Sequence, residues 1–455
     1  MRSISVSRVI IPFLLVGVLS LLGGWGIVQY GANFQNLLFL VLLIAMVVII
    51  AMGKKALQVG FVVWIWMFIL GYRTIHLTSY FPLHPLIIFL ALLFLILLFA
   101  LKSAPNVRLK LPRLLWVFSI FWLWGFIPGA LRGFPWSKMI SYAINFFLLI
   151  PLFMIILYLS RESGFWKSAT LTFLWSGALI SLLGAIEFYS PQFRSLLPGL
   201  IQVNVEGLQS FSGFERASFA FFGATPAVII SALALPMVWL LPKYYKSKIA
   251  VFFSFVLLAI LGIGIYISGT RVAWLMLFCA SFVLAYFGMG LSGIGLSAIF
   301  WGIFSRFFSA EVWTLIFSLY TPFVSAQISD PSLQIRFTRQ QNAFILAIQN
   351  PFGVGWSGSG WVHGDFTQVA ANLGILAGII FLAWYLHTLF RAWKIYRKYP
   401  KDWMFQAILT SFILGGIILL TEGVQVLPQF VMPVWFVWGL MESYLQQKNS
   451  DFIIP

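Results

Sequence analysis

The sequence predicts an all-α polytopic membrane protein that forms a single membrane domain over residues 1–455. Of its 455 residues, 61% are hydrophobic and 9% are charged, against about 25% charged residues in a soluble domain. Apolar runs repeatedly reach the roughly 20 residues that a helix needs to cross a bilayer. Alternation of period two is absent, and so are tandem repeats and low-complexity linkers, which favours helices in one continuous domain.

Apolar runs between charged or turn-rich breaks give about 14 transmembrane helices. The N-terminal run could be taken for a signal peptide, but the many later spans favour an uncleaved first helix. The third span is short, and the eleventh begins with glycines. The expected spans are residues 9–29, 35–53, 56–71, 85–101, 112–130, 139–160, 168–187, 218–241, 249–267, 272–288, 292–308, 366–390, 403–421 and 430–443.

The basic residues orient this map. The net charge of +17 would suit nucleic acid binding, but positive charges in short loops follow the positive-inside rule, so no nucleic acid partner is expected. If both termini are cytoplasmic, 28 − 9 = 19 of the 28 Lys and Arg residues lie on the cytoplasmic side. The nine external ones are Arg73, Arg132, Lys138, Arg194, Arg216, Arg271, Arg306, Arg336 and Arg339.

Eight of these nine external cations are arginines. The planar guanidinium offers paired donors to phosphate oxygens, so the bias favours an anionic ligand. A solvated charge at a helix end would satisfy several of the same positions equally well. The external loops that carry these arginines are a shorter one at 188–217 and a large one at 309–365, between the eleventh and twelfth spans.

The large loop contains the sequence PSLQIRFTRQQNAFILAIQNPFG, which predicts an amphipathic helix. Pro331 suits its start, and Asn350-Pro351 ends it, because a residue before proline disfavours the helical region. Arg336 and Arg339 lie beside an apolar stripe of Phe337, Phe344, Ile345 and Ile348. The two arginines either bind a phosphate or belong to an interfacial helix that contacts lipid headgroups.

Arg271 follows the turn Ser-Gly-Thr at residues 268–270, at the external mouth of two spans. An arginine near the hydrocarbon is costly and usually marks a functional site, although a snorkelling side chain at the interface is the competing interpretation. The turn would also bring backbone amides near an anion.

The stretch NPFGVGWSGSGWVHGDFTQ, residues 350–368, holds His363 just before the twelfth span. Its glycines predict a loose approach, and Trp356 and Trp361 would be stacking or interface anchors. A neutral imidazole can accept a proton at physiological pH, although a lone histidine beside a membrane is often structural. Asp365 would either orient the imidazole or cap the next helix. Paired histidines and neighbouring cysteines are absent from this stretch, so no metal site is expected.

The arginine after a Ser/Gly turn, the RxxR helix in a long external loop, the NPFGVG turn and the histidine that follows together resemble the O-antigen ligase and O-antigen polymerase superfamily of membrane glycosyltransferases. The resemblance covers mainly residues 260–390 and implies a GT-C-like helical fold. By motif, Arg271 matches the arginine after the turn, Arg336 or Arg339 matches the loop arginine, and His363 matches the histidine at the loop end. The sequence departs from the pattern at Val272, Gly364 and Asp365.

The resemblance implies transfer of a saccharide from an undecaprenyl-diphosphate carrier to a hydroxyl of a glycan or lipid acceptor. The reaction would take place on the external face of a bacterial inner membrane. His363 would be the catalytic base, and Arg271, Arg336 and Arg339 would bind the diphosphate, with Asp365 and Arg216 as candidates for support. Diphosphate is a good leaving group, so transfer needs no cofactor or metal, and direct displacement would invert the anomeric carbon. The enzyme would be either a polymerase or a ligase. Two other classes stay open: a transporter of an anion or lipid-linked glycan, and an assembly scaffold.

Overall fold

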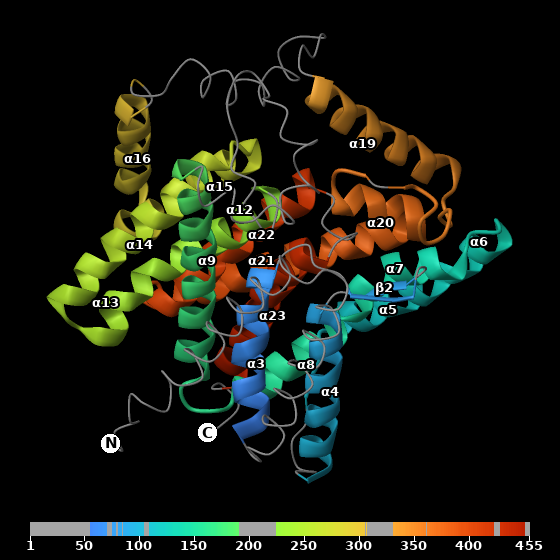
Figure 1. The fold of residues 1–455 in the computed structure, drawn as a ribbon, viewed down its shortest axis with the longest axis horizontal. Coiled ribbons are helices and arrows are strands. Elements are labelled where there is room, and N and C mark those ends of the chain that lie inside the picture. The colour runs from blue at the N-terminus through green and yellow to red at the C-terminus, as the bar shows by residue number, and fades with distance from the viewer. Residues whose placement is uncertain are drawn as a thin grey trace.

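The described residues form a bundle of helices and one short pair of strands (Figure 1). The computed structural model describes residues 55–70, 75–78, 81–83, 85–103, 109–190, 224–304, 306, 331–360, 362–422 and 428–450. Strands β1 (Ile75–Thr78) and β2 (Phe81–Leu83) pair antiparallel. The helical elements are α3 (Ala56–Trp66), η2 (Met67–Leu70), α4 (Pro85–Ser103), α5 (Arg113–Trp124), α6 (Phe126–Leu131), α7 (Trp136–Phe147), α8 (Leu149–Leu159), α9 (Phe165–Tyr189), α12 (Ala224–Ala234), η4 (Leu235–Trp239), α13 (Leu240–Tyr245), α14 (Lys248–Ile267), α15 (Arg271–Met289), α16 (Leu291–Phe304), α19 (Pro331–Gln349), α20 (Asp365–Leu373), α21 (Ile375–Lys398), α22 (Trp403–Thr421) and α23 (Pro428–Ser450).

Nine stretches among the described residues are helical, long and apolar enough to cross a membrane. This confirms the multi-pass helical class that the composition predicts. The expected spans 9–29 and 35–53 lie outside the described residues. The expected third and eleventh spans correspond to the shorter apolar helices Ala56–Trp66 and Leu291–Ile303. The nine stretches are Leu86–Ser103, Arg113–Leu131, Trp136–Leu159, Phe165–Tyr189, Ala227–Tyr245, Lys248–Ile267, Arg271–Met289, Ile375–Lys398 and Trp403–Thr421.

The expected twelfth span, 366–390, is wrong at its start. The chain forms the short helix α20 first, breaks at Gly374, and only then begins the span Ile375–Lys398. Gly374 has a φ of +104°, a backbone conformation that residues with a side chain rarely adopt. A Cβ at this position would lie 2.6 Å from the carbonyl oxygen of Pro351. The backbone therefore turns where the apolar run continues.

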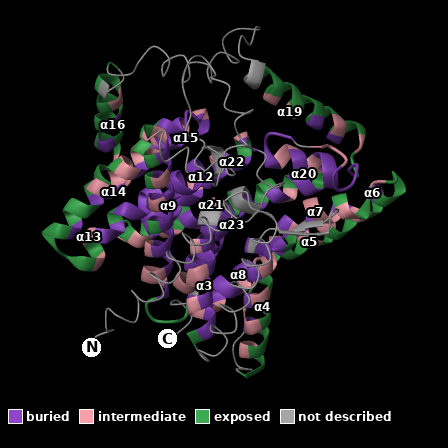
Figure 2. Ribbon diagram, in the orientation of Figure 1, coloured by how far each residue is buried: buried purple, intermediate pink, exposed green. Residues whose placement is uncertain are grey.

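Helix α23 lies at the centre of the bundle and packs against α8, α12, α21 and α22. Trp435 and Trp438 are fully buried on it, and the ring of Trp438 lies 4.4 Å from that of Trp384 on α21. Figure 2 shows buried residues in this centre and exposed residues on the peripheral helices. Residues 431–445 of α23 are all buried, as expected for a central helix.

Basic residues from separate helices gather at one end of the bundle. Lys243 lies 4.3 Å from the ring centroid of Trp403, and Lys448 lies 4.9 Å from that of Tyr399. These contacts join the ends of α13, α22 and α23 to the turn at 399–402 between α21 and α22. We call this the basic end. Ile375, Ile267 and Thr421, at the opposite ends of α21, α14 and α22, define the far end. Which side of the membrane each end faces stays a prediction.

Candidate functional site

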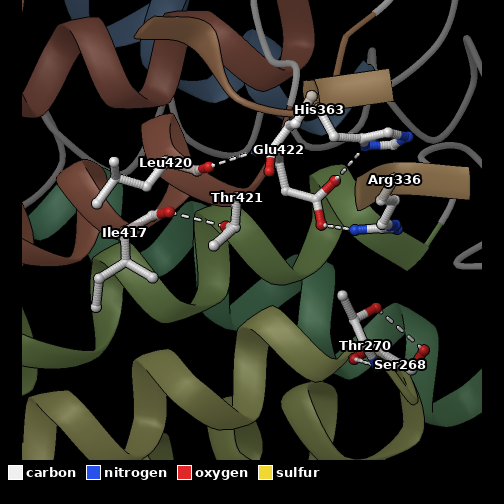
Figure 3. A network of polar contacts seen from close by, with 9 residues as sticks. Ser268, Thr270, Arg336, His363, Ile417, Leu420, Thr421 and Glu422 are labelled. Carbon is white, nitrogen blue, oxygen red and sulfur yellow. Dashed lines mark hydrogen bonds and ion pairs between the residues drawn. The ribbon is translucent and has the colours of Figure 1, made fainter. Parts of the chain in front are cut away.

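Three side chains from separate segments meet at the far end of the bundle (Figure 3). Arg336 of α19 donates from Nη1 to Oε1 of Glu422 at 2.5 Å. The other carboxylate oxygen, Oε2, lies 3.8 Å from Nδ1 of His363, within ion-pairing distance. Glu422 and His363 are both buried, while the Arg336 side chain keeps 32% of its surface exposed. One carboxylate thus joins the predicted loop arginine to the predicted base.

The local structure places Glu422 at this junction. Helix α22 ends at Thr421, and Glu422 is its C-cap residue in an extended conformation, with its amide still donating to Ile418. The neighbouring carbonyl of Leu420 accepts from Nε2 of Gln340, one turn after Arg336 on α19. Arg336 and Gln340, four residues apart on one face of α19, therefore both bind the end of α22.

The surroundings of Glu422 favour its ionised form. Burial raises its pKa, but the charge of Arg336 and the contacts with His363 and Arg336 lower it, and the net effect is a pKa below the ordinary value. Glu422 is one residue beyond the span Trp403–Thr421, so the charge lies at the end of the span. The Oε2 atom of this carboxylate faces Nδ1 of His363 at 3.8 Å.

Arg271 is the first residue of α15 and lies at the same end of the bundle. The preceding turn lies close to the three side chains in Figure 3, and α15 packs against α22. The sharp turn that the sequence predicts is present, since Gly269 has a φ of +55°. Its amides are used internally, because Gly269 donates to Tyr266 and Thr270 donates to Oγ of Ser268. The expectation that these two amides contact an anion is therefore wrong.

Two other predicted site residues follow Arg336 and His363 closely along the chain. Arg339 is exposed on α19, three residues after Arg336. Asp365 is fully buried as the first residue of α20, and the N-cap residue of that helix is Gly364. Asp365 is therefore not the N-cap residue that one of its two expected roles required, although an acid in the first turn suits the helix dipole. Arg216 lies outside the described residues, as does the loop at 191–217.

The glycine-rich stretch before His363 is held tightly, against the expectation of a loose approach. Val354 and Gly355 donate backbone hydrogen bonds to Ala371 and Asn372 at the end of α20, at 3.0 and 2.8 Å. A Cβ on Gly355 would lie 2.1 Å from the amide nitrogen of Gly129. The glycines allow close approach and positive φ angles here, so they fix the path of the chain.

Trp356 is a core residue, which corrects its expected role as a stacking or interface anchor. Its side chain is fully buried, and its indole nitrogen donates to the carbonyl of Trp122 on α5. Arg132, one of the nine external cations, donates to the carbonyl of Gly353 and to Oδ1 of Asn350. Arg132 therefore stabilises the glycine-rich stretch. Trp361 lies outside the described residues.

Sequence reasoning missed Glu422. The signal for it was an acid directly after a long apolar run, in a chain with only 11 acids, since ionisable residues at such depths are costly and usually functional. Within the described part of the chain, no three His, Cys, Asp or Glu side chains form a group that could hold a metal ion.

Neither the protein-family models nor the curated proteins contain a match to this chain.

Proposed function

We propose that the chain is a membrane glycosyltransferase that moves a saccharide from an undecaprenyl-diphosphate carrier to an acceptor hydroxyl. The observation that carries the proposal is the junction of Arg336, Glu422 and His363, which puts an anion-binding group and a potential base on one buried carboxylate. The resemblance to O-antigen ligases and polymerases supports the same chemistry. The proposal includes a GT-C-like fold of 14 spans, in a bacterial inner membrane, with the far end external.

The chemistry follows from these side chains. Nε2 of His363 takes the proton of the acceptor hydroxyl while its oxygen attacks the anomeric carbon. The bond from that carbon to the diphosphate oxygen breaks, and the carbon inverts. The exposed part of the Arg336 guanidinium, together with Arg339 and Arg271, binds the departing diphosphate and stabilises its growing charge.

Glu422 has two roles in this scheme. Its negative charge, with Oε2 at 3.8 Å from Nδ1, favours the tautomer with the proton on Nδ1, which leaves Nε2 as the accepting nitrogen. Through Oε1 it fixes one edge of the Arg336 guanidinium, and the other N–H groups stay available to phosphate oxygens. Glu422 is a positioning residue, because neither role requires it to touch a substrate.

The test uses the purified protein in lipid nanodiscs with a lipid-linked oligosaccharide and an acceptor glycan, without added metal. We expect release of undecaprenyl diphosphate together with a longer glycan. His363→Ala should lower transfer by about 10²–10⁴-fold, the usual contribution of a general base, while donor binding is largely kept. The matched control is His387→Ala, because His387 is exposed on α21.

Two outcomes would contradict the proposal. If folded His363→Ala keeps more than about a tenth of the wild-type rate, His363 is not the base. The second outcome is measured with the protein in lipid vesicles. If the lipid-linked glycan crosses the vesicle membrane with its sugar–diphosphate bond intact, the protein is a transporter.

A further inference from the structure

We infer that helix α19 lies along the membrane surface, with one exposed apolar stripe in the lipid of the leaflet at the far end. The occupant of this stripe is the bilayer itself. The inference does not depend on the proposed reaction.

The two ends of α19 are fixed at the same level. Near its start, Arg336 and Gln340 bind Glu422 and Leu420 at the end of α22. Just after its last residue, the carbonyl of Pro351 accepts from the amide of Ile375, the first residue of α21.

Helices α21 and α22 are consecutive and are joined at the basic end by residues 399–402. Their other ends, at Ile375 and Thr421, therefore lie on the same side of a membrane that both of them cross. A helix bound to both of these ends runs along the membrane surface. From Arg336 to Gln349, its last residue, α19 rises over 13 residue steps, or about 20 Å at 1.5 Å per residue.

The residues on α19 divide into three faces at 100° per residue. The face toward the protein contains Arg336, Gln340, Ala343 and Ala347; the two alanines are buried, and they pack against a cluster with Val362 and Ala371. Small residues there let α19 approach α20 closely, as Figure 1 shows.

The second face is the exposed apolar stripe, formed by Phe337, Phe344, Ile345 and Ile348. These side chains are exposed by 50, 53, 42 and 56%, respectively, and Gln334 and Gln341 are exposed polar residues on the same face. Since four large apolar side chains gather on one face of a helix at the membrane boundary, water is an unfavourable neighbour for them.

The third face is mostly polar and exposed, with Thr338, Arg339, Asn342 and Gln349, and it also carries Ile335, which is 51% exposed. It lies on the side of the helix away from the middle of the apolar stripe. This division into protein-facing, lipid-facing and water-facing residues is what an interfacial helix at the edge of a bundle requires.

More exposed apolar side chains follow beyond the C-terminal end of α19 and at the start of α21, whose first amide binds Pro351. Phe352, just beyond α19, is 74% exposed, and its carbonyl accepts from the indole nitrogen of Trp124 on α5. On α21, Leu376 and Ile379 are 54 and 57% exposed and follow directly after Ile375. Exposed apolar side chains on membrane-spanning helices face lipid. We therefore expect the stripe on α19 to contact the same lipid.

The test is spin-label accessibility of the full-length protein in lipid nanodiscs. Cys279 is first replaced by serine, because it is the single native cysteine. Nitroxide labels are then placed at Phe344→Cys and Ile348→Cys on the stripe, and at Asn342→Cys and Gln349→Cys on the polar face as matched controls. Collisions with oxygen report lipid, and collisions with a water-soluble nickel chelate report solvent.

We expect the stripe labels to collide several-fold more with oxygen than with nickel, and the polar-face labels to show the reverse ratio. Equal nickel accessibility at all four positions would overturn the inference. The inference would also be overturned if the stripe labels were poorly accessible to both reagents and showed spin–spin broadening that disappears when unlabelled protein is added. A second copy of the protein would then cover the stripe. All four positions are exposed, so none of the substitutions removes a buried contact.

Discussion

Removing Arg336 tests whether the junction with Glu422 is a real energetic contact. The structure provides a matched control on the same helix, since Arg339 is exposed and lies three residues later. We compare Arg336→Met with Arg339→Met, which remove the same charge from two positions of α19. We expect Arg336→Met to destabilise the protein and Arg339→Met to change the free energy of unfolding by less than about 0.5 kcal/mol.

The magnitude follows from the geometry. Two unit charges with centres about 4 Å apart attract by roughly 4 kcal/mol at an effective dielectric constant of about 20. Breaking a fully buried pair by removing one partner costs about 3–5 kcal/mol. Because 32% of the Arg336 side chain is exposed, solvent screens the pair, and we expect a loss of about 2–3 kcal/mol. Glu422→Gln should cost less, about 1–2 kcal/mol, since the remaining guanidinium can be hydrated.

The assay is reversible unfolding in mixed micelles with increasing denaturing detergent, followed by tryptophan fluorescence and extrapolated linearly. The double variant Arg336→Met with Glu422→Gln completes a thermodynamic cycle. If the pair interacts, the double variant loses less than the sum of the single losses, by about 1 kcal/mol or more. Additive losses, or equal stability of Arg336→Met and Arg339→Met, would refute the contact and with it the site.

Three further outcomes are expected. Because the pKa of Glu422 is lowered in the folded protein, its stabilising contribution is present above the ordinary glutamate pKa and is lost as the pH falls through the folded value. The stability of Glu422→Gln should therefore lack this part of the loss at acid pH. The same loss at acid pH in wild type and Glu422→Gln would contradict the assignment. Gly355→Ala should destabilise by about 2 kcal/mol or more, since its Cβ would overlap Gly129, whereas Gly360→Ala, with a φ of +66° in open space, should cost only about 1 kcal/mol; similar losses would show that close packing does not matter there. In a Cys279→Ser background, Asn342→Cys should react with an impermeant thiol reagent in intact cells and Lys401→Cys should not, and the reverse pattern would invert the proposed orientation.

Local features of this chain could be predicted because they depend on neighbouring residues. The helix at 331–349 has its proline start and its Asn-Pro end within its own sequence, and α19 begins and ends there. The turn at 268–270 likewise follows from Gly269, which adopts a positive φ. Both features were visible without knowledge of the tertiary structure.

Contacts between distant segments could not be predicted in the same way. Glu422 is 86 residues from Arg336 along the chain, and its place after an apolar run does not identify Arg336 as its partner. The glycine-rich stretch was misinterpreted for a related reason. Glycine serves either freedom or close approach, and only the distance from Gly355 to Gly129 distinguishes the two uses. Hydropathy also runs through Gly374, where the backbone turns.

The position of Glu422 accounts for the depth of the proposed site. An ionised carboxylate inside the hydrocarbon is costly, and Glu422 avoids this cost because it lies one residue beyond the span and receives a counter-charge from Arg336. Helix α19, fixed to the ends of α21 and α22, delivers that arginine at the level of the membrane boundary. A lipid-linked donor presents its diphosphate at the same level, since its chain lies in the hydrocarbon and its sugar in water. The helix that holds Arg336 in place would therefore also set the depth at which the donor phosphates meet His363.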